Sequence, residues 1–252
     1  MRSLYNRRSS SADEDNPYWM SFSDIMAALL VIFILATIIF MMELIQKSRK
    51  WDEVIEEIAK AEDVRKSIIK EIETELREKN IPVKVIDNDT VLRIPEHVLT
   101  FNSGSSELPM DIKTRTTAKE IGSTLYKAIS KAERWKFLDT IFVEGHTDPD
   151  AYNNKMLKGN WGLSTMRAIS LWQFWNDATP KGGKLDALIN HRGKKLFSVS
   201  GYAATRRSCE NACNKSESSK KAYEKDRRID IRFTVRRPAI KEYKEVIKKV
   251  LK

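Results

Sequence analysis

A single aspartate, Asp24, lies at the edge of the most apolar stretch of the chain. It is the only charged residue between Asp15 and Glu43, and eighteen uncharged residues, 25–42, follow it directly. A run of that length predicts a membrane-spanning helix, and a carboxylate at mid-bilayer costs roughly 2.5–3.5 kcal/mol on insertion scales. Desolvation favours the protonated form of a carboxylic acid, so such a group can take a proton from one side and release it to the other. Asp24 therefore meets the requirement for a proton relay.

Small side chains surround Asp24 along the expected helix. Ser21 lies three residues before it, and Ala27 and Ala28 lie three and four residues after it. On a helix these positions share one strip, which lets other helices approach and leaves room for water. The alternative is that Asp24 pairs with a basic or backbone group of a partner and fixes assembly without moving ions. One helix cannot enclose an ion path, so the relay needs a partner with several membrane helices.

The rest of the chain carries no signature of an enzyme. It has no nucleophile elbow, no phosphate-binding glycine-rich loop and no His/Glu metal motif. We therefore expect no catalytic residues, no cofactor and no metal site. Cys209 and Cys213 are the only two cysteines. In an exported domain they could close a small-loop disulfide, and two reduced thiols are the alternative.

Positive charge gathers toward the C-terminal end of the 252-residue chain, whose formal net charge is +10. Residues 181–252 contain 21 lysines and arginines against 8 acidic residues. Such a surface could meet a polyanion such as the cell wall, or it could be ordinary solvated surface. A domain outside the membrane would rarely meet DNA, so we expect no direct binding of nucleic acid.

The elements that must position these residues follow from periodicity. We expect an α+β protein: a single N-terminal transmembrane helix, a helical connector, and an α/β sandwich with a mixed sheet. The expected segments are a flexible tail at 1–16, a transmembrane helix at 17–45, a connector at 46–80, a soluble domain at 81–237 and a basic helix at 238–252. Within the domain we expect strands at 83–86, 91–94, 138–144, 196–200 and 229–235, and helices at 110–132 and 163–176.

The connector carries one narrow apolar stripe in an otherwise charged sequence. Its members recur at steps of three and four: Val54, Ile58, Ala61, Val64, Ile68, Ile72 and Leu76. The stripe predicts either self-association with a second copy of the same helix, which we prefer slightly, or packing against the chain's own domain.

Two stretches resemble known families. The segment Tyr18–Leu30 resembles the transmembrane start of MotB-type stator subunits of ion-driven motors. The soluble domain is similar to the OmpA-like peptidoglycan-binding fold through the following residues: Phe101–Gly104 with Leu108, Val143–Asp148, Asn160–Ser164 with Arg167 and Ala168, Gly201–Tyr202, and Asp226–Ile229.

The resemblance implies a site for the cell wall. In the family, the aspartate of Thr-Asp and the arginine of Leu-Ser-x-x-Arg hold the diaminopimelate of the wall peptide, which corresponds to Asp148 and Arg167. The usual Asn-Arg-Arg is Asp226-Arg227-Arg228 here, a departure that puts the role of the asparagine in doubt. The implied peptidoglycan-binding set is Asp148, Arg167, Tyr152, Asn153, Asn160 and Arg227.

The resemblance also implies ion coupling through Asp24, with H+ preferred to Na+, and it implies partners and a location. It indicates a homodimer inside a ring of five MotA-like subunits, in the bacterial inner membrane, with the N-terminus cytoplasmic and the C-terminal domain periplasmic. Charge alone does not orient the chain, because three basic residues precede the apolar run and three follow it closely. Among MotB-like families the chain looks most similar to the ZorB subunits of Zorya anti-phage defence, whose ring is formed by ZorA. A flagellar stator subunit and a passive wall anchor are the alternatives.

Overall fold

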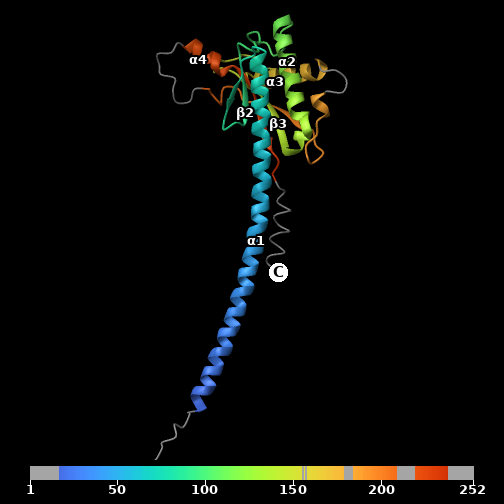
Figure 1. Cartoon of the computed structure of the whole chain (residues 1–252). Coiled ribbons are helices and arrows are strands. Elements are labelled where there is room, and N and C mark those ends of the chain that lie inside the picture. Colours follow the sequence, from blue (N-terminus) through green and yellow to red (C-terminus); the bar gives the residue numbers. More distant parts are fainter. Residues whose placement is uncertain (1–16, 155, 157, 179–183, 209–218, 238–252) are drawn as a thin grey trace, which may run out of the picture. The chain divides into compact units, whose positions relative to one another are not determined.

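The computed structural model describes residues 17–154, 156, 158–178, 184–208 and 219–237 (Figure 1). The expected tail at 1–16, the expected helix at 238–252 and both cysteines, Cys209 and Cys213, lie outside the described residues. The described chain divides into two compact units, one ending at Glu53 and one starting at Val54. The second unit therefore begins inside the segment expected as a separate connector.

Of the described residues, the first unit contains the N-terminal part of helix α1 (Pro17–Glu78), up to Glu53. Every described side chain from Phe22 to Arg49 is exposed, including the apolar ones. The hydroxyl of Thr37 donates to the carbonyl of Ile34 at 2.8 Å, so the one hydroxyl within the apolar run is satisfied by its own helix. Among the described residues, this helix alone is long and apolar enough to cross a membrane.

The second unit contains a five-stranded mixed sheet in the order β1-β2-β5-β3-β4. β3 and β4 are parallel, and the other neighbouring pairs are antiparallel. The turn between β1 and β2 holds Asp87, Asn88 and Asp89 at positive φ, which short Asn and Asp side chains tolerate. The strands are β1 (Lys84–Ile86), β2 (Val91–Pro95), β3 (Leu138–His146), β4 (Phe197–Gly201) and β5 (Arg228–Val235). The five expected strands and the α+β class are confirmed.

Two long helices of the second unit, α2 (Ile112–Ser130) and α3 (Asn160–Ala178), also agree with expectation. They pack closely at Gly122, where an added Cβ would lie 2.6 Å from the ring of Trp175. The indole of Trp175 donates to the carbonyl of Ala118 at 2.8 Å, so this buried side chain of α3 is hydrogen-bonded to α2. Short helical segments lie at Lys131–Phe137, Leu185–Ala187 and Ser219–Asp226 (α4).

The apolar stripe of the connector packs within the chain's own domain. Ala61, Ile68, Ile72 and Leu76 are at most 2% exposed, and the last three belong to the same hydrophobic core as the inner faces of β2, β3 and β5. From Ala61 onward, the preference for self-association through this stripe was therefore wrong. A helix that covers a sheet needs the same apolar spacing as one that pairs with a second copy, so the sequence alone did not separate the two.

Alternate residues of each strand point to opposite faces of the sheet. In β5, Ile229, Ile231 and Phe233 join the core, and the charged residues between them point to the other face. β3 follows the same rule, with Ile141 and Val143 in the core. The helices thus share one apolar face of the sheet, and the opposite face carries charge.

Candidate functional site

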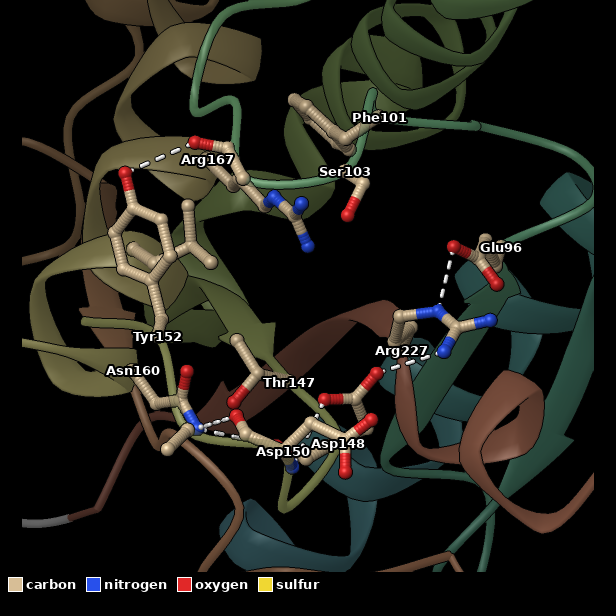
Figure 2. A pocket seen from close by; sticks show the side chains of 13 residues that line it. Glu96, Phe101, Ser103, Thr147, Asp148, Asp150, Tyr152, Asn160, Arg167 and Arg227 are labelled. Atoms are coloured by element: carbon tan, nitrogen blue, oxygen red, sulfur yellow. Dashed lines mark hydrogen bonds and ion pairs between the residues drawn. The ribbon is translucent and has the colours of Figure 1, made fainter. Parts of the chain in front are cut away.

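A cavity of about 350 Å³ lies where β3 ends and α3 begins (Figure 2). It receives residues from the loop after β2, the loop after β3, the start of α3 and the residue before β5. Its lining consists of Glu96, Phe101, Ser103, Gly104, Thr147, Asp148, Asp150, Ala151, Tyr152, Asn160, Leu163, Arg167 and Arg227. Five of the six residues expected to bind peptidoglycan are thereby brought together.

Two glycines allow α3 to lie directly against the sheet beside this cavity. A Cβ on Gly145 would come within 2.0 Å of the carbonyl oxygen of Ser164, and a Cβ on Gly201 within 2.2 Å of the hydroxyl of Thr165. The Ser164 hydroxyl also accepts a hydrogen bond from the backbone N–H of Ala203 at 3.1 Å. The first turns of α3 are therefore fixed to β3 and β4, which places Arg167 at the cavity.

Arg167 is buried and held by the loop that follows β2. Its Nε donates to the carbonyl of Ser105 at 2.9 Å, and Nη2 donates to the carbonyl of Asn102 at 3.2 Å. The guanidinium also lies over the ring of Phe101, 5.3 Å from the centroid. Burial lowers the pKa of Arg167, and the charges of Glu96 and Asp148 oppose that shift. Arginine keeps its charge at neutral pH, so the cavity contains a rigidly positioned cation.

Asp148 faces Arg167 from the other side of the cavity, together with Arg227 (Figure 2). Arg227 joins two acids: its Nη1 donates to Asp148 Oδ2 and its Nε to Glu96 Oε1, both at 2.7 Å. The hydrogen bond to Glu96, followed by the one to Asp148, raises the pKa of Arg227. One arginine thus orients two carboxylates, and the Glu96-Arg227-Asp148 triad keeps a net negative charge.

Tyr152 and Asn160 line the remaining sides of the cavity. The Tyr152 hydroxyl donates to the carbonyl of Gly104 at 2.9 Å, and Asn160 Nδ2 donates to the carbonyls of Asp148 and Asp150 at 3.3 and 2.8 Å. These bonds tie the loop after β3 to the rest of the pocket. Asn153 is exposed and does not belong to the described lining, so the expectation that it lines the groove is not supported.

Sequence reasoning missed Glu96 and gave no role to Asp226. Glu96 directly follows β2, and the pairing of Pro95 with Arg228 brings it beside Arg227. No motif surrounds it, so only the strand order could have identified it. Asp226 is fully buried and accepts from Arg207 Nε at 3.0 Å and from the backbone of Ser208 at 2.7 Å. It orders a neighbouring loop instead of lining the cavity.

Asp24 belongs to the first unit, where its side chain is exposed, as are those of Ala27 and Ala28. The side chain of Ser21 lies outside the described ones. Among the described residues there is no cluster of His, Cys, Asp and Glu that could hold a metal ion.

The cavity presents charges of both signs to a ligand. One side of the cavity is lined by Arg227 and three acids, Glu96, Asp148 and Asp150. Arg167 lies on the opposite side. Ser103 adds a hydroxyl beside Arg167. Such a pocket can hold a small zwitterion, with its ammonium near the acids and its carboxylate near Arg167.

No protein-family model and no curated protein matches the chain. Among solved structures, the chain is similar to a MotB-like protein from Desulfovibrio vulgaris (17% identity, 73% of this chain and 98% of that chain, TM-score 0.45). It is similar to the periplasmic domain of Helicobacter pylori MotB (17% identity, 66% and 86%, TM-score 0.44) and to the cell wall anchor of the T6SS from Pseudomonas aeruginosa (18% identity, 66% and 95%, TM-score 0.43). At such identities and scores, no residue role is transferred from these proteins.

Proposed function

We propose that the pocket between Asp148 and Arg167 binds the peptide of peptidoglycan through the free amino acid end of diaminopimelate. The observation that carries the proposal is the placement of a buried arginine and an oriented pair of carboxylates on opposite sides of one cavity of about 350 Å³. Diaminopimelate offers an ammonium and a carboxylate at fixed separation. Charge-assisted hydrogen bonds to both ends recognise that spacing better than either charge alone.

The fixed geometry of the two sides supports this role. Arg167 is held by two backbone carbonyls and Asp148 by Arg227, so neither group must be ordered when the ligand arrives. Arg227 already neutralises one carboxylate of its triad, which leaves negative charge for an ammonium group.

The anchoring role is tested by sedimentation of the full-length protein with purified cell wall in detergent. Asp148→Ala and Arg167→Ala are each expected to weaken binding about tenfold or more, because a charge-assisted bond is worth roughly 1.5–3 kcal/mol. Asn153→Ala, from the same loop but outside the lining, is the matched control and should bind normally. Unchanged binding by both pocket variants would exclude this site.

We further propose that the wall-bound chain is a stator subunit of an ion-driven motor in the bacterial inner membrane. Asp24 would relay protons along α1, two copies of the chain would stand within a ring of five MotA-like subunits, and the N-terminus would be cytoplasmic. One support is that Asp24 is a lone acid beside small residues on an exposed apolar helix. The other is that the second unit of the same chain contains the pocket proposed above to bind the wall. Force made at the ring then has a fixed point to act against.

Ion coupling is tested by Asp24→Asn in cells that express the chain with its multi-helix membrane partner. Proton flux across the membrane and biological activity are expected to be lost, while the variant still assembles and still binds the wall. Asp24→Glu, which keeps the acid, should retain part of the flux. Full activity of Asp24→Asn would instead identify the protein as a passive anchor.

Within stator proteins, we propose a ZorB-type subunit of an anti-phage defence system, with a ZorA-like ring. The excess of lysine and arginine over residues 181–252 and the cysteine pair Cys209 and Cys213 support this choice over a flagellar subunit. Deletion of the gene should raise phage plating efficiency and leave swimming unchanged. Loss of swimming with unchanged plating would identify a flagellar stator.

A further inference from the structure

A second cavity, of about 660 Å³, opens on the sheet face opposite the core. We call it the arginine pocket because five of its eleven lining residues are arginines. The lining is Asp87, Arg93, Phe142, Glu144, His146, Tyr202, Arg206, Arg207, Arg228, Asp230 and Arg232. None of these residues lines the cavity around Asp148, so the two cavities are distinct.

Strand pairing builds the floor of the arginine pocket. Asp230 of β5 is paired with Arg93 on one side and with Glu144 on the other, which sets two carboxylates directly opposite each other. Like charges in that position repel, and both side chains are at most 2% exposed. Such a floor is stable only if cations compensate it.

The floor carboxylates fix three of the arginines. Asp230 accepts two hydrogen bonds from Arg93, from Nε and Nη2 at 2.9 Å each, and a third from Arg228 Nε at 3.0 Å. Glu144 Oε1 accepts from Arg232 Nε at 2.9 Å. Burial raises the pKa of Asp230, but the hydrogen bonds from Arg93 and the charge of Arg228 outweigh it and keep the pKa below its ordinary value. Asp230 is therefore charged and already paired with two arginines.

Two further arginines, Arg206 and Arg207, lie partly exposed at the mouth of the pocket. Their side chains are 49% exposed for Arg206 and 39% for Arg207. Arg206 lies 3.7 Å over the ring of Tyr202, which in turn stacks on His146. Among the described residues its guanidinium has one ion pair, to Glu144 at 3.8 Å, which is too long for a hydrogen bond. Among the described residues, Arg207 donates a side-chain hydrogen bond only through Nε, to Asp226 at 3.0 Å.

We infer that the arginine pocket binds a dianionic phosphoryl group, either as free phosphate or as a phosphate monoester, with Arg206 and Arg207 as the principal donors. Five arginines face three carboxylates in the lining, and a fourth carboxylate, Asp226, pairs with Arg207, so the pocket keeps a net positive charge that favours an anion. Planar guanidinium groups with paired donors suit the oxygens of phosphate. The cavity is larger than one phosphate, which leaves room for the group that carries it.

His146 adds no charge to this balance. Burial, followed by the charge of Arg228, lowers its pKa to about 3, so the ring is neutral at physiological pH. Its part is to support Tyr202, with ring centroids 5.4 Å apart, and thereby the stacked Arg206. The mouth is thus ordered before an anion arrives, which reduces the entropic cost of binding.

The test is calorimetric titration of the full-length protein in detergent with inorganic phosphate, glycerol 3-phosphate and a phosphodiester, glycerophosphocholine. We expect saturable binding of phosphate or of the monoester, and at least about tenfold weaker binding of the monoanionic diester. Tighter binding of glycerol 3-phosphate than of phosphate would assign the site to a phosphorylated ligand, and the reverse order to free phosphate. Absence of binding by both dianions, or equal binding of the diester, contradicts the proposal.

The variant Arg206→Gln/Arg207→Gln should lose at least about tenfold in affinity for the preferred dianion. The matched control is Arg77→Gln/Arg192→Gln, which removes the same charge from exposed arginines outside the lining. Unfolding in urea will show that both double variants are folded. If both lose affinity equally, binding reflects net charge alone and the arginine pocket is not the site.

Discussion

The two cavities of the domain use opposite arrangements of the same charged groups. In the cavity around Asp148, one arginine, Arg227, joins two acids. In the arginine pocket, one acid, Asp230, joins two arginines. The first arrangement leaves carboxylate capacity for a cation, and the second leaves guanidinium capacity for an anion. Buried charges must be compensated within the fold. The number of acids relative to arginines in each cluster then decides whether negative or positive charge remains for a ligand.

Adjacent residues separate the two cavities. Arg227 and Arg228 are neighbours in sequence, yet they reach different cavities because successive residues at the start of β5 point in opposite directions. The end of β3 does the same, with His146 in the arginine pocket and the next residue, Thr147, in the lining of the other cavity. One pair of antiparallel strands thus serves two sites of opposite charge.

The largest expected effect is a difference in stability between variants of the two acids, Asp230 and Asp148. Asp230→Asn leaves the buried Arg228 and the partly buried Arg93 without a charged partner and should lower the free energy of unfolding by about 3–5 kcal/mol. Asp148→Asn, whose partner Arg227 keeps Glu96, should cost about 1 kcal/mol or less. Urea unfolding of the full-length proteins measures both. Equal losses would show that the two arrangements do not differ in the way described.

A smaller effect is the pH dependence of stability, because the arginine pocket contains a buried histidine, His146. The folded protein keeps His146 neutral down to a pKa of about 3, whereas the unfolded chain protonates it near 6.5. The unfolded state therefore binds more protons between these values, and stability falls as pH drops through that window by at most about 1.4 kcal/mol per pH unit.

His146→Gln should flatten this slope between pH 6.5 and 4.5, measured as the urea midpoint against pH, while substitution of the exposed His97 by Gln should not. The lowered pKa of Asp230 adds to the slope only below its ordinary value near 3.8, outside this range. An unchanged slope in His146→Gln would show that His146 is not held neutral by burial.

The elements were predictable from the sequence because each has a local signature. The alternation of Ile229, Ile231 and Phe233 with charged residues marked β5, and two apolar runs around four polar residues marked the first hairpin. The residues Asp148 and Arg167 came from a resemblance, and the structure places both at one cavity. The groups that hold these two side chains in place are the loop carbonyls that bind Arg167 and the acid Glu96. No local sequence pattern marks them.

The arginine pocket was not predictable for a related reason. Arg93 and Asp230 are separated by 137 positions and meet only because β5 inserts between β2 and β3. Periodicity determines which face of a strand is apolar, but it does not determine which strand lies beside it. The charged alternate residues of β5 therefore looked like ordinary solvated surface.

A variant with only a modest effect on stability, Arg227→Gln, separates the two functions most sharply. Arg227→Gln breaks the bridge between Glu96 and Asp148 and should cost only about 1–2 kcal/mol of stability, because the side chain is partly exposed. It should weaken wall binding about tenfold and leave phosphate binding unchanged. Arg206→Gln should show the reverse pattern, since Arg206 lies at the mouth of the other cavity. Wall sedimentation and phosphate titration on both variants test this. A variant that weakens both ligands would mean that the two cavities are coupled through β3 and β5 and do not act as independent sites.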